Sequence, residues 1–313
     1  MTAPLFPTET TSLPEGTTAS WFESHDGARL RLAHFGGSGA RGTALIVPGW
    51  TEPVEKYGET ALDLQDRGFA VVAYDPRGQG LSDRHTDGDD RARIDDFSKH
   101  IGDLNAVVAS LAAERLTVVG HSMGGLITLS WLAGGGAADA AVLSAPATRI
   151  FRNVAQRVAT RGLAWVMCRA GLRDQAVGGE GAAMTFEGNN LTSDPERHKV
   201  MRDLALSDPK MALPKPTPAF VAAMDRQQVV LHGRDAFAQL SVPTMIVSAG
   251  NDTVVDPTDH ELIARSSPHI DVVHVPGAEH ELLMERDELR DQFWDAFDAH
   301  IARHLPGLSA DLT

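Results

Sequence analysis

The chain of 313 residues lacks several features that mark whole classes of protein. It has one cysteine, Cys168, which excludes an intrachain disulfide and any metal or iron–sulfur site built from several cysteines. No apolar stretch approaches the roughly 18 residues of a membrane-spanning helix. The Thr- and Pro-rich residues 1–15 lack the apolar core of a signal peptide. These absences favour a cytoplasmic protein with no transmembrane segment.

Positive charge is also scarce. The chain has 28 Lys and Arg against 42 Asp and Glu, which gives a formal net charge of −14. Phosphate backbones and anionic membrane surfaces are repelled by such a charge on average. We therefore expect no nucleic-acid partner and, at most, transient contact with a membrane. The sequence does not indicate an oligomeric state.

Three motifs that bind cofactors are missing. The chain has no phosphate loop of the G-x-x-x-x-G-K-[ST] type and no G-x-G-x-x-G that opens a helix after the first strands. The pairs His260-Glu261 and His280-Glu281 each lack the second histidine of an H-E-x-x-H zinc motif. No metal, nucleotide or flavin cofactor is therefore expected.

What the sequence does contain is an alternation of short apolar runs with segments of helical periodicity. Strands are expected at residues 19–23, 29–34, 43–47, 69–74, 116–119, 140–143, 244–248 and 270–275. Helices are expected at residues 58–67, 94–114, 122–133, 260–265 and 287–303. Strands that alternate with helices predict an α/β fold, with a mostly parallel sheet covered by helices on both faces.

The alternation stops after about Pro146 and resumes near residue 240. The interval contains helical stretches and loops but no convincing buried strand. We therefore predict three parts along the chain: a first core segment at 1–147, a mainly helical cap insertion at 148–239, and a second core segment at 240–313.

The strongest chemical signal is Gly120-His121-Ser122-Met123-Gly124, which fits the pattern G-x-S-x-G. It follows an apolar strand and opens a helix, the context in which a sharp turn pushes the serine hydroxyl out of the sheet. The start of the helix also presents free backbone N–H groups to the site. The alternative is that Ser122 only caps the helix.

A serine nucleophile needs a base and an orienting carboxylate, and in this architecture the acid and then the histidine follow later strands. Asp252 comes after the strand expected at 244–248, and His280 comes after the strand expected at 270–275. Among their competitors, Asp256 precedes a proline and fits a helix N-cap, and His274 lies within a strand. Ser122, Asp252 and His280 are therefore the predicted catalytic triad.

Acyl transfer also requires donors for the developing oxyanion. The backbone N–H of Met123, directly after the nucleophile, is one candidate. The second is expected from the loop Pro48-Gly49-Trp50, where the N–H of Trp50 can donate and Pro48 cannot.

Together these residues resemble the α/β-hydrolase superfamily, and within it the lysophospholipase and monoacylglycerol lipase branch that is grouped with serine aminopeptidase-like hydrolases. The bacterial L2-like lysophospholipases are especially similar. The segments that carry the resemblance are residues 49–52 with 55–57, 75–84, 120–125, 191–197, 248–252 and 277–285. The resemblance implies an eight-stranded sheet with a cap, the triad and oxyanion donors named above, and no cofactor. One departure is Pro48, where the family usually has histidine.

The resulting functional hypothesis is a serine esterase of lysophospholipase or monoacylglycerol lipase type. Its substrate would be a small-molecule or single-chain lipid ester with an apolar acyl group. The alternatives are another triad enzyme (an aminopeptidase, an acyltransferase or a C–C hydrolase) or a non-catalytic binding protein of the same fold. Five apolar residues of the cap either line an acyl pocket or form the cap's own core: Phe151, Trp165, Met167, Phe186 and Leu191.

Overall fold

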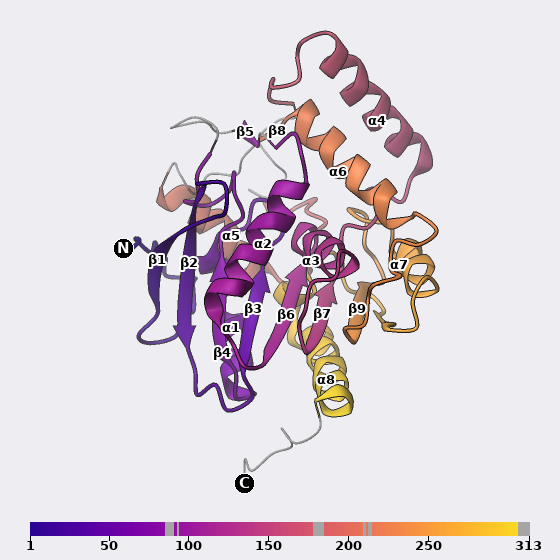
Figure 1. Ribbon diagram of the computed structural model, residues 1–313. Coiled ribbons are helices and arrows are strands. Elements are labelled where there is room, and N and C mark those ends of the chain that lie inside the picture. The colour runs from indigo at the N-terminus through magenta and orange to yellow at the C-terminus, as the bar shows by residue number, and fades with distance from the viewer. Residues whose placement is uncertain (85–90, 93, 178–184, 209–210, 212–214, 306–313) are drawn as a thin grey trace.

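The computed structural model describes residues 1–84, 91–92, 94–177, 185–208, 211 and 215–305, and an eight-stranded sheet forms its centre (Figure 1). The strand order is β1-β2-β4-β3-β6-β7-β9-β10. Only β2 runs against its neighbours in this sheet, and every other pair of adjacent strands is parallel. The strands are β1 (Thr18–Glu23), β2 (Arg29–Gly36), β3 (Thr43–Val47), β4 (Ala70–Tyr74), β6 (Leu116–His121), β7 (Ala140–Ser144), β9 (Thr244–Ala249) and β10 (Ile270–Val275). The sequence predicted this mostly parallel sheet.

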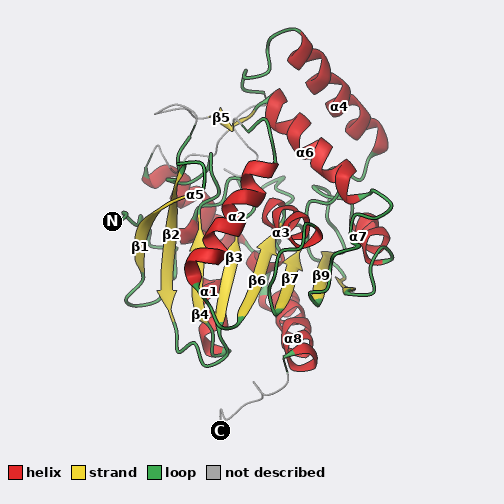
Figure 2. Ribbon diagram, in the orientation of Figure 1, coloured by secondary structure: helices red, strands yellow, loops and turns green. Residues whose placement is uncertain are grey.

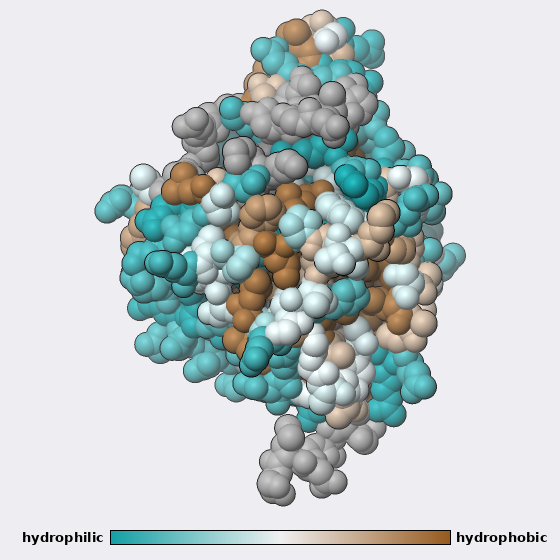
Figure 3. Space-filling model, turned by 90° about the vertical axis from the view of Figure 1, so that its left-hand side faces the viewer, coloured by the Kyte–Doolittle hydropathy of each residue, from teal (hydrophilic) through white to brown (hydrophobic). Residues whose placement is uncertain are grey.

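Helices cover both faces of the sheet, and its central strands are therefore buried on both sides. Figure 2 shows α2 crossing in front of the sheet and α8 lying behind it. The helices of this part of the chain are α1 (Gly58–Asp66), α2 (Ser98–Leu111), α3 (Met123–Ala133), α7 (Pro257–Ala264) and α8 (Asp287–His304), with the 3₁₀ turns η1 (Val54–Tyr57) and η4 (Leu282–Met284). Seen from the side of β1, the surface is hydrophilic around its rim, and hydrophobic residues gather near its middle (Figure 3).

Between β7 and β9 the chain is mainly helical, as expected. It forms α4 (Val154–Arg169), α5 (Pro195–Ser207) and α6 (Pro218–Leu231), and a two-residue strand β8 (Lys215–Pro216) that pairs with β5 (Arg91–Ala92). The helices α4 and α6 pack against each other and project beyond one end of the sheet (Figure 1). The bounds of a cap domain at 148 and 239 remain a prediction.

A buried arginine ties the sheet to the loops that lead to the site. Arg31 of β2 is fully buried and contacts Glu55 of η1 at 2.7 Å and Asp75, after β4, at 2.8 Å. Asp75 also accepts the backbone N–H groups of Val54 and Leu81. A buried guanidinium is tolerated only when it is paired and hydrogen-bonded, so these contacts hold residues 52–57 in one place.

None of the helices in the described ranges combines the length and apolar character needed to cross a bilayer.

Candidate active site

Ser122 occupies a strained turn between β6 and α3. Its backbone has φ +48° and ψ −112°, a left-handed conformation that side-chain-bearing residues rarely adopt. The chain passes so close to β3 that a Cβ atom on Gly124 would lie 1.9 Å from the carbonyl oxygen of Val47. The glycine after the nucleophile is therefore required by the packing. The Ser122 hydroxyl makes no capping bond to α3, so the alternative role as a helix cap is not observed.

The structure brings the three residues of the predicted triad together. The Nε2 atom of His280 lies 2.9 Å from the Oγ atom of Ser122, although the two residues are 158 positions apart. The Nδ1 atom of His280 lies 2.7 Å from Oδ2 of Asp252. The other carboxylate oxygen of Asp252 accepts the N–H groups of Val254 and Val255. These bonds fix the carboxylate, which in turn orients the imidazole.

All three side chains are withdrawn from solvent, and their charges depend on each other. Burial alone would lower the pKa of His280, but the adjacent Asp252 carboxylate raises that pKa above its ordinary value. Burial alone would raise the pKa of Asp252, but His280 and the two backbone N–H donors lower it. The arrangement therefore favours an imidazole that takes up a proton readily beside an ionised aspartate.

The competing residues have other partners. Asp256 caps α7 by accepting the N–H of Thr258, as its place before a proline predicts. His274 lies on a partly exposed face of β10 and contacts Glu261 at 2.8 Å. His260 is buried, and it bonds the hydroxyl of Ser248 and the carbonyl oxygen of Pro146. Each of these side chains has a structural role away from Ser122.

The loop after β3 is held from both sides. Gly49 donates its N–H to Glu52 at 2.5 Å, and Thr51 donates its N–H to Gln79. Within the part of the chain that the structure describes, the N–H of Trp50 between them has no hydrogen-bond partner. This free donor is what the predicted oxyanion role of Trp50 requires. Met123, the other predicted donor, is the first residue of α3.

A buried charged cluster, which the sequence analysis missed, lies beside the triad. Lys56 contacts Glu52 at 2.6 Å and Glu281 at 2.9 Å, and Tyr57 donates its hydroxyl to Glu52. Burial alone would raise the pKa of Glu52, but Lys56 and His121 lower it to about 2. The signal in the sequence is the four-residue spacing of Glu52 and Lys56, directly after the oxyanion loop. This cluster anchors the loop through the bond from Gly49.

The apolar residues expected in the cap do not form a buried core. Trp165 is 59% exposed and Phe186 is 37% exposed. Trp165 lines a groove of about 510 Å³ between α4 and α6. The α6 residue Phe220 packs on Trp50, with ring centroids 4.1 Å apart, so this helix pair is joined to the oxyanion loop. The expectation that all five residues either line a pocket or pack as a core is therefore too simple.

Comparison with known proteins places the chain in one family. The family model for serine aminopeptidase, S33, matches residues 38–287. Lysophospholipase L2 of Escherichia coli (strain K12) is 28% identical over 300 residues, which cover 90% of this chain and 87% of that protein. Probable lysophospholipase L2 of Haemophilus influenzae is 27% identical over 264 residues, 81% of each chain.

Solved structures show the same fold. A soluble variant of monoglyceride lipase from Saccharomyces cerevisiae aligns with a TM-score of 0.76 at 18% identity, over 96% of this chain and 100% of that one. Monoacylglycerol lipase of Paleococcus ferrophilus aligns with a TM-score of 0.70 at 18% identity, over 87% and 98% of the two chains. The sheet, the strained serine turn and the family match agree, and the chain belongs to the serine aminopeptidase S33 family of α/β-hydrolases.

Proposed function

We propose that the protein is a serine hydrolase that cleaves carboxylic esters with an apolar acyl group, of lysophospholipase or monoacylglycerol lipase type. The observation that carries the proposal is the imidazole of His280, which contacts the hydroxyl of Ser122 and the carboxylate of Asp252 at the same time. A serine activated in this way performs acyl transfer. The relatives named lysophospholipase L2 support an ester substrate.

The reaction would proceed through an acyl-enzyme. The Oγ atom of Ser122 attacks the ester carbonyl carbon while its proton passes to Nε2 of His280. The N–H groups of Trp50 and Met123 stabilise the oxyanion that forms. His280 then protonates the departing alcohol as the ester C–O bond breaks. In the second half, water gives a proton to His280 and attacks the acyl carbon, and the proton returns to Ser122 as the acid leaves.

The groove between α4 and α6 supports an apolar acyl group. Its walls include Val158, Ala164, Trp165 and Val221. The contact of Phe220 with Trp50 links α6 to the proposed oxyanion donor. The groove also carries Arg161, Asp225 and Arg226, and Arg161 pairs with Asp225 at 3.0 Å. An acyl chain that left the catalytic serine on this side would meet the apolar side chains between these charged groups.

A fluorophosphonate probe tests the proposal directly. Intact mass should show one covalent adduct on the wild-type protein and none on Ser122→Ala, with circular dichroism confirming that the variant is folded. Labelled protein then justifies a panel of lysophospholipids, monoacylglycerols, short acyl esters and aminoacyl amides. No adduct on the wild type, or an adduct retained in Ser122→Ala, would overturn the assignment. Turnover of the amides alone would replace the esterase with an aminopeptidase.

A further inference from the structure

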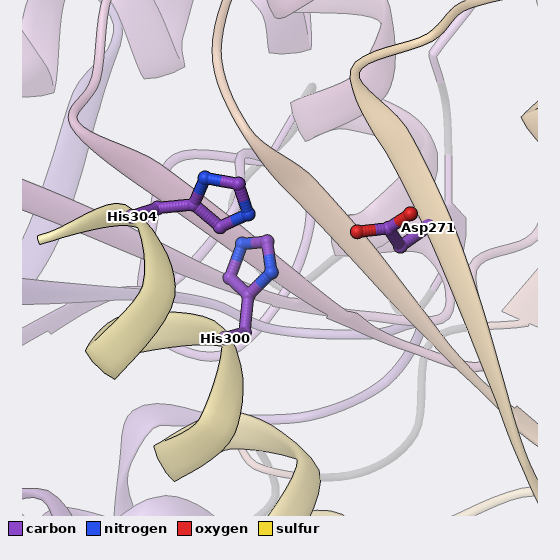
Figure 4. A group of neighbouring side chains, drawn as sticks. All are labelled: Asp271, His300 and His304. Atoms are coloured by element: carbon purple, nitrogen blue, oxygen red, sulfur yellow. The ribbon is translucent and has the colours of Figure 1, made fainter.

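A second cluster of ligand-type side chains lies at the other end of the sheet from the triad. Asp271 is at the start of β10, and His300 and His304 are one turn apart near the end of α8. One ligand atom from each residue lies within 4.8 Å of the other two. Figure 4 shows both rings turned so that a nitrogen of each faces the carboxylate. His280, by contrast, follows the far end of β10.

The two histidines have the right nitrogen atoms free. Nε2 of His300 donates to the carbonyl oxygen of Pro243 at 3.3 Å, and no described residue forms a hydrogen bond with Nδ1, which leaves its lone pair available. Nε2 of His304 is buried and has no hydrogen-bond partner in the described ranges. Such an unpartnered buried nitrogen costs free energy unless something binds it.

Two other clusters of this kind, among the described residues, already contain a cation. Lys56 sits between Glu52 and Glu281, and Arg77 sits between Asp26 and Asp103. Their acidic groups are neutralised by the protein itself.

Among the described residues, Asp271 forms one ion pair, with Arg303 at 3.4 Å, and the side chains of Asp271 and Arg303 are 56% and 68% exposed. An exposed pair of this kind contributes little to stability and is easily displaced. The cluster at the end of α8 therefore differs from the other two, because it combines two imidazoles with a weakly engaged carboxylate.

We propose that Asp271, His300 and His304 form a binding site for one divalent transition-metal ion, zinc being the best match. Zinc takes imidazole nitrogen and carboxylate oxygen in a tetrahedral arrangement, with water able to occupy a fourth position. The ligands would be Nδ1 of His300, Nε2 of His304 and one oxygen of Asp271. An H-E-x-x-H search does not detect this pair, because no glutamate follows His300. The ion would tie the last turn of α8 to β10 without touching the triad.

The experiment measures metal binding, so it does not depend on enzyme activity. Untagged protein is treated with a chelator, dialysed and titrated with Zn²⁺ by calorimetry, and thermal unfolding is followed with Zn²⁺ and with EDTA. We expect one ion per chain and a higher Tm with Zn²⁺. Co²⁺ should give the intense visible absorption of a tetrahedral site.

Variants locate the ion. His304→Gln and Asp271→Asn change partly exposed side chains at the ends of their elements, and each should weaken Zn²⁺ binding by at least about tenfold. His274→Gln, which removes another partly exposed histidine from β10, is the matched control and should bind like the wild type. No stoichiometric binding by the wild type, or unchanged binding by both ligand variants, would overturn the proposal. Loss of binding in the control as well would equally contradict it.

Discussion

The edge of the sheet that carries Ser122 and the helix pair α4–α6 differ in what they bury. The first buries polar side chains, and the second exposes apolar ones. At the edge, Ser122, Asp252 and His280 are 8%, 1% and 4% exposed, and each polar group has a defined partner. The helix α4, in contrast, buries only Ala164. The apolar side chains that these two helices expose include Val154, Val158, Leu163, Trp165, Val166, Val229 and Val230.

The difference follows from what each region rests on. The triad residues lie on loops that follow adjacent parallel strands. The backbone hydrogen bonds between these strands therefore fix the positions of the loops. In the helix pair, α6 packs against both α3 and α4, whereas α4 rests on α6 and leaves apolar side chains exposed. In the proposed enzyme, the first region performs the chemistry and the second selects the acyl group.

The largest effect is expected on catalysis, from a substitution of the buried residue Asp252. Asp252→Asn keeps the shape of the side chain but removes the charge that stabilises protonated His280 and selects its tautomer. We expect kcat to fall by about 10⁴-fold. Steady-state kinetics on an activated short-chain ester measures this loss, and circular dichroism checks the fold. A loss of less than tenfold would show that Asp252 is not the orienting acid.

The second-largest effect is expected on the free energy of unfolding, from a substitution of Lys56. Lys56→Met leaves the buried carboxylates of Glu52 and Glu281 without their cation, which should cost about 3–5 kcal/mol of the free energy of unfolding. Lys99→Met is the matched control, because Lys99 also pairs with an acid four residues away, Asp95, but both side chains are about half exposed. The control should lose less than about 1 kcal/mol. Urea unfolding measures both, and equal losses would contradict the assigned role of Lys56.

The buried imidazole of His280 should make both kcat/KM and stability depend on pH. The folded-state pKa of His280 is raised above 6.5, and the base must be neutral to accept the proton of Ser122. We therefore expect kcat/KM to fall as the pH drops through this raised pKa. The contribution of His280 to stability has the opposite sign: it is fully present below the unfolded-state pKa and is lost as the pH rises through the folded-state pKa.

Kinetic and thermal-unfolding profiles over the same pH range check both parts. Asp252→Asn provides the control for the cause, because it removes the main group that raises the pKa. In that variant the acid limb of the residual activity should move to lower pH. An acid limb that stays in place would contradict the assignment of the shift to Asp252.

Much of this fold follows from the sequence alone. The strands expected at 43–47 and 270–275 match β3 and β10 residue for residue, because short apolar runs between turn residues leave little choice. The helix expected at 94–114 is shorter, Ser98–Leu111, since the apolar spacing continues beyond the residues whose backbone is helical. The predicted triad residues meet because the ends of parallel strands lie at one edge of a sheet.

The residues that the sequence did not reveal are those whose partners lie far along the chain. Nothing local marks Lys56 as a bridge to Glu281 or shows that Gln79 holds Thr51, because these contacts exist only after folding. His300 and His304 are four residues apart in the sequence, but Asp271 lies near them only through the packing of α8 beside β10.

The smallest effect is expected on the exposed side, at Trp165. Because its side chain is 59% exposed, Trp165→Ser should change the free energy of unfolding by less than about 1 kcal/mol. If the groove holds the acyl chain, KM for long-chain monoacylglycerols should rise about fivefold, which corresponds to roughly 1 kcal/mol of lost apolar contact. The KM for acetyl esters should stay constant, because a short chain does not reach the groove.

Val229→Ser is the control, because it removes a similarly exposed apolar side chain outside the groove. It should alter neither the free energy of unfolding nor the KM for long-chain esters. Equal effects of the two substitutions on long-chain esters would mean that the helix pair contributes general apolar surface rather than an acyl site.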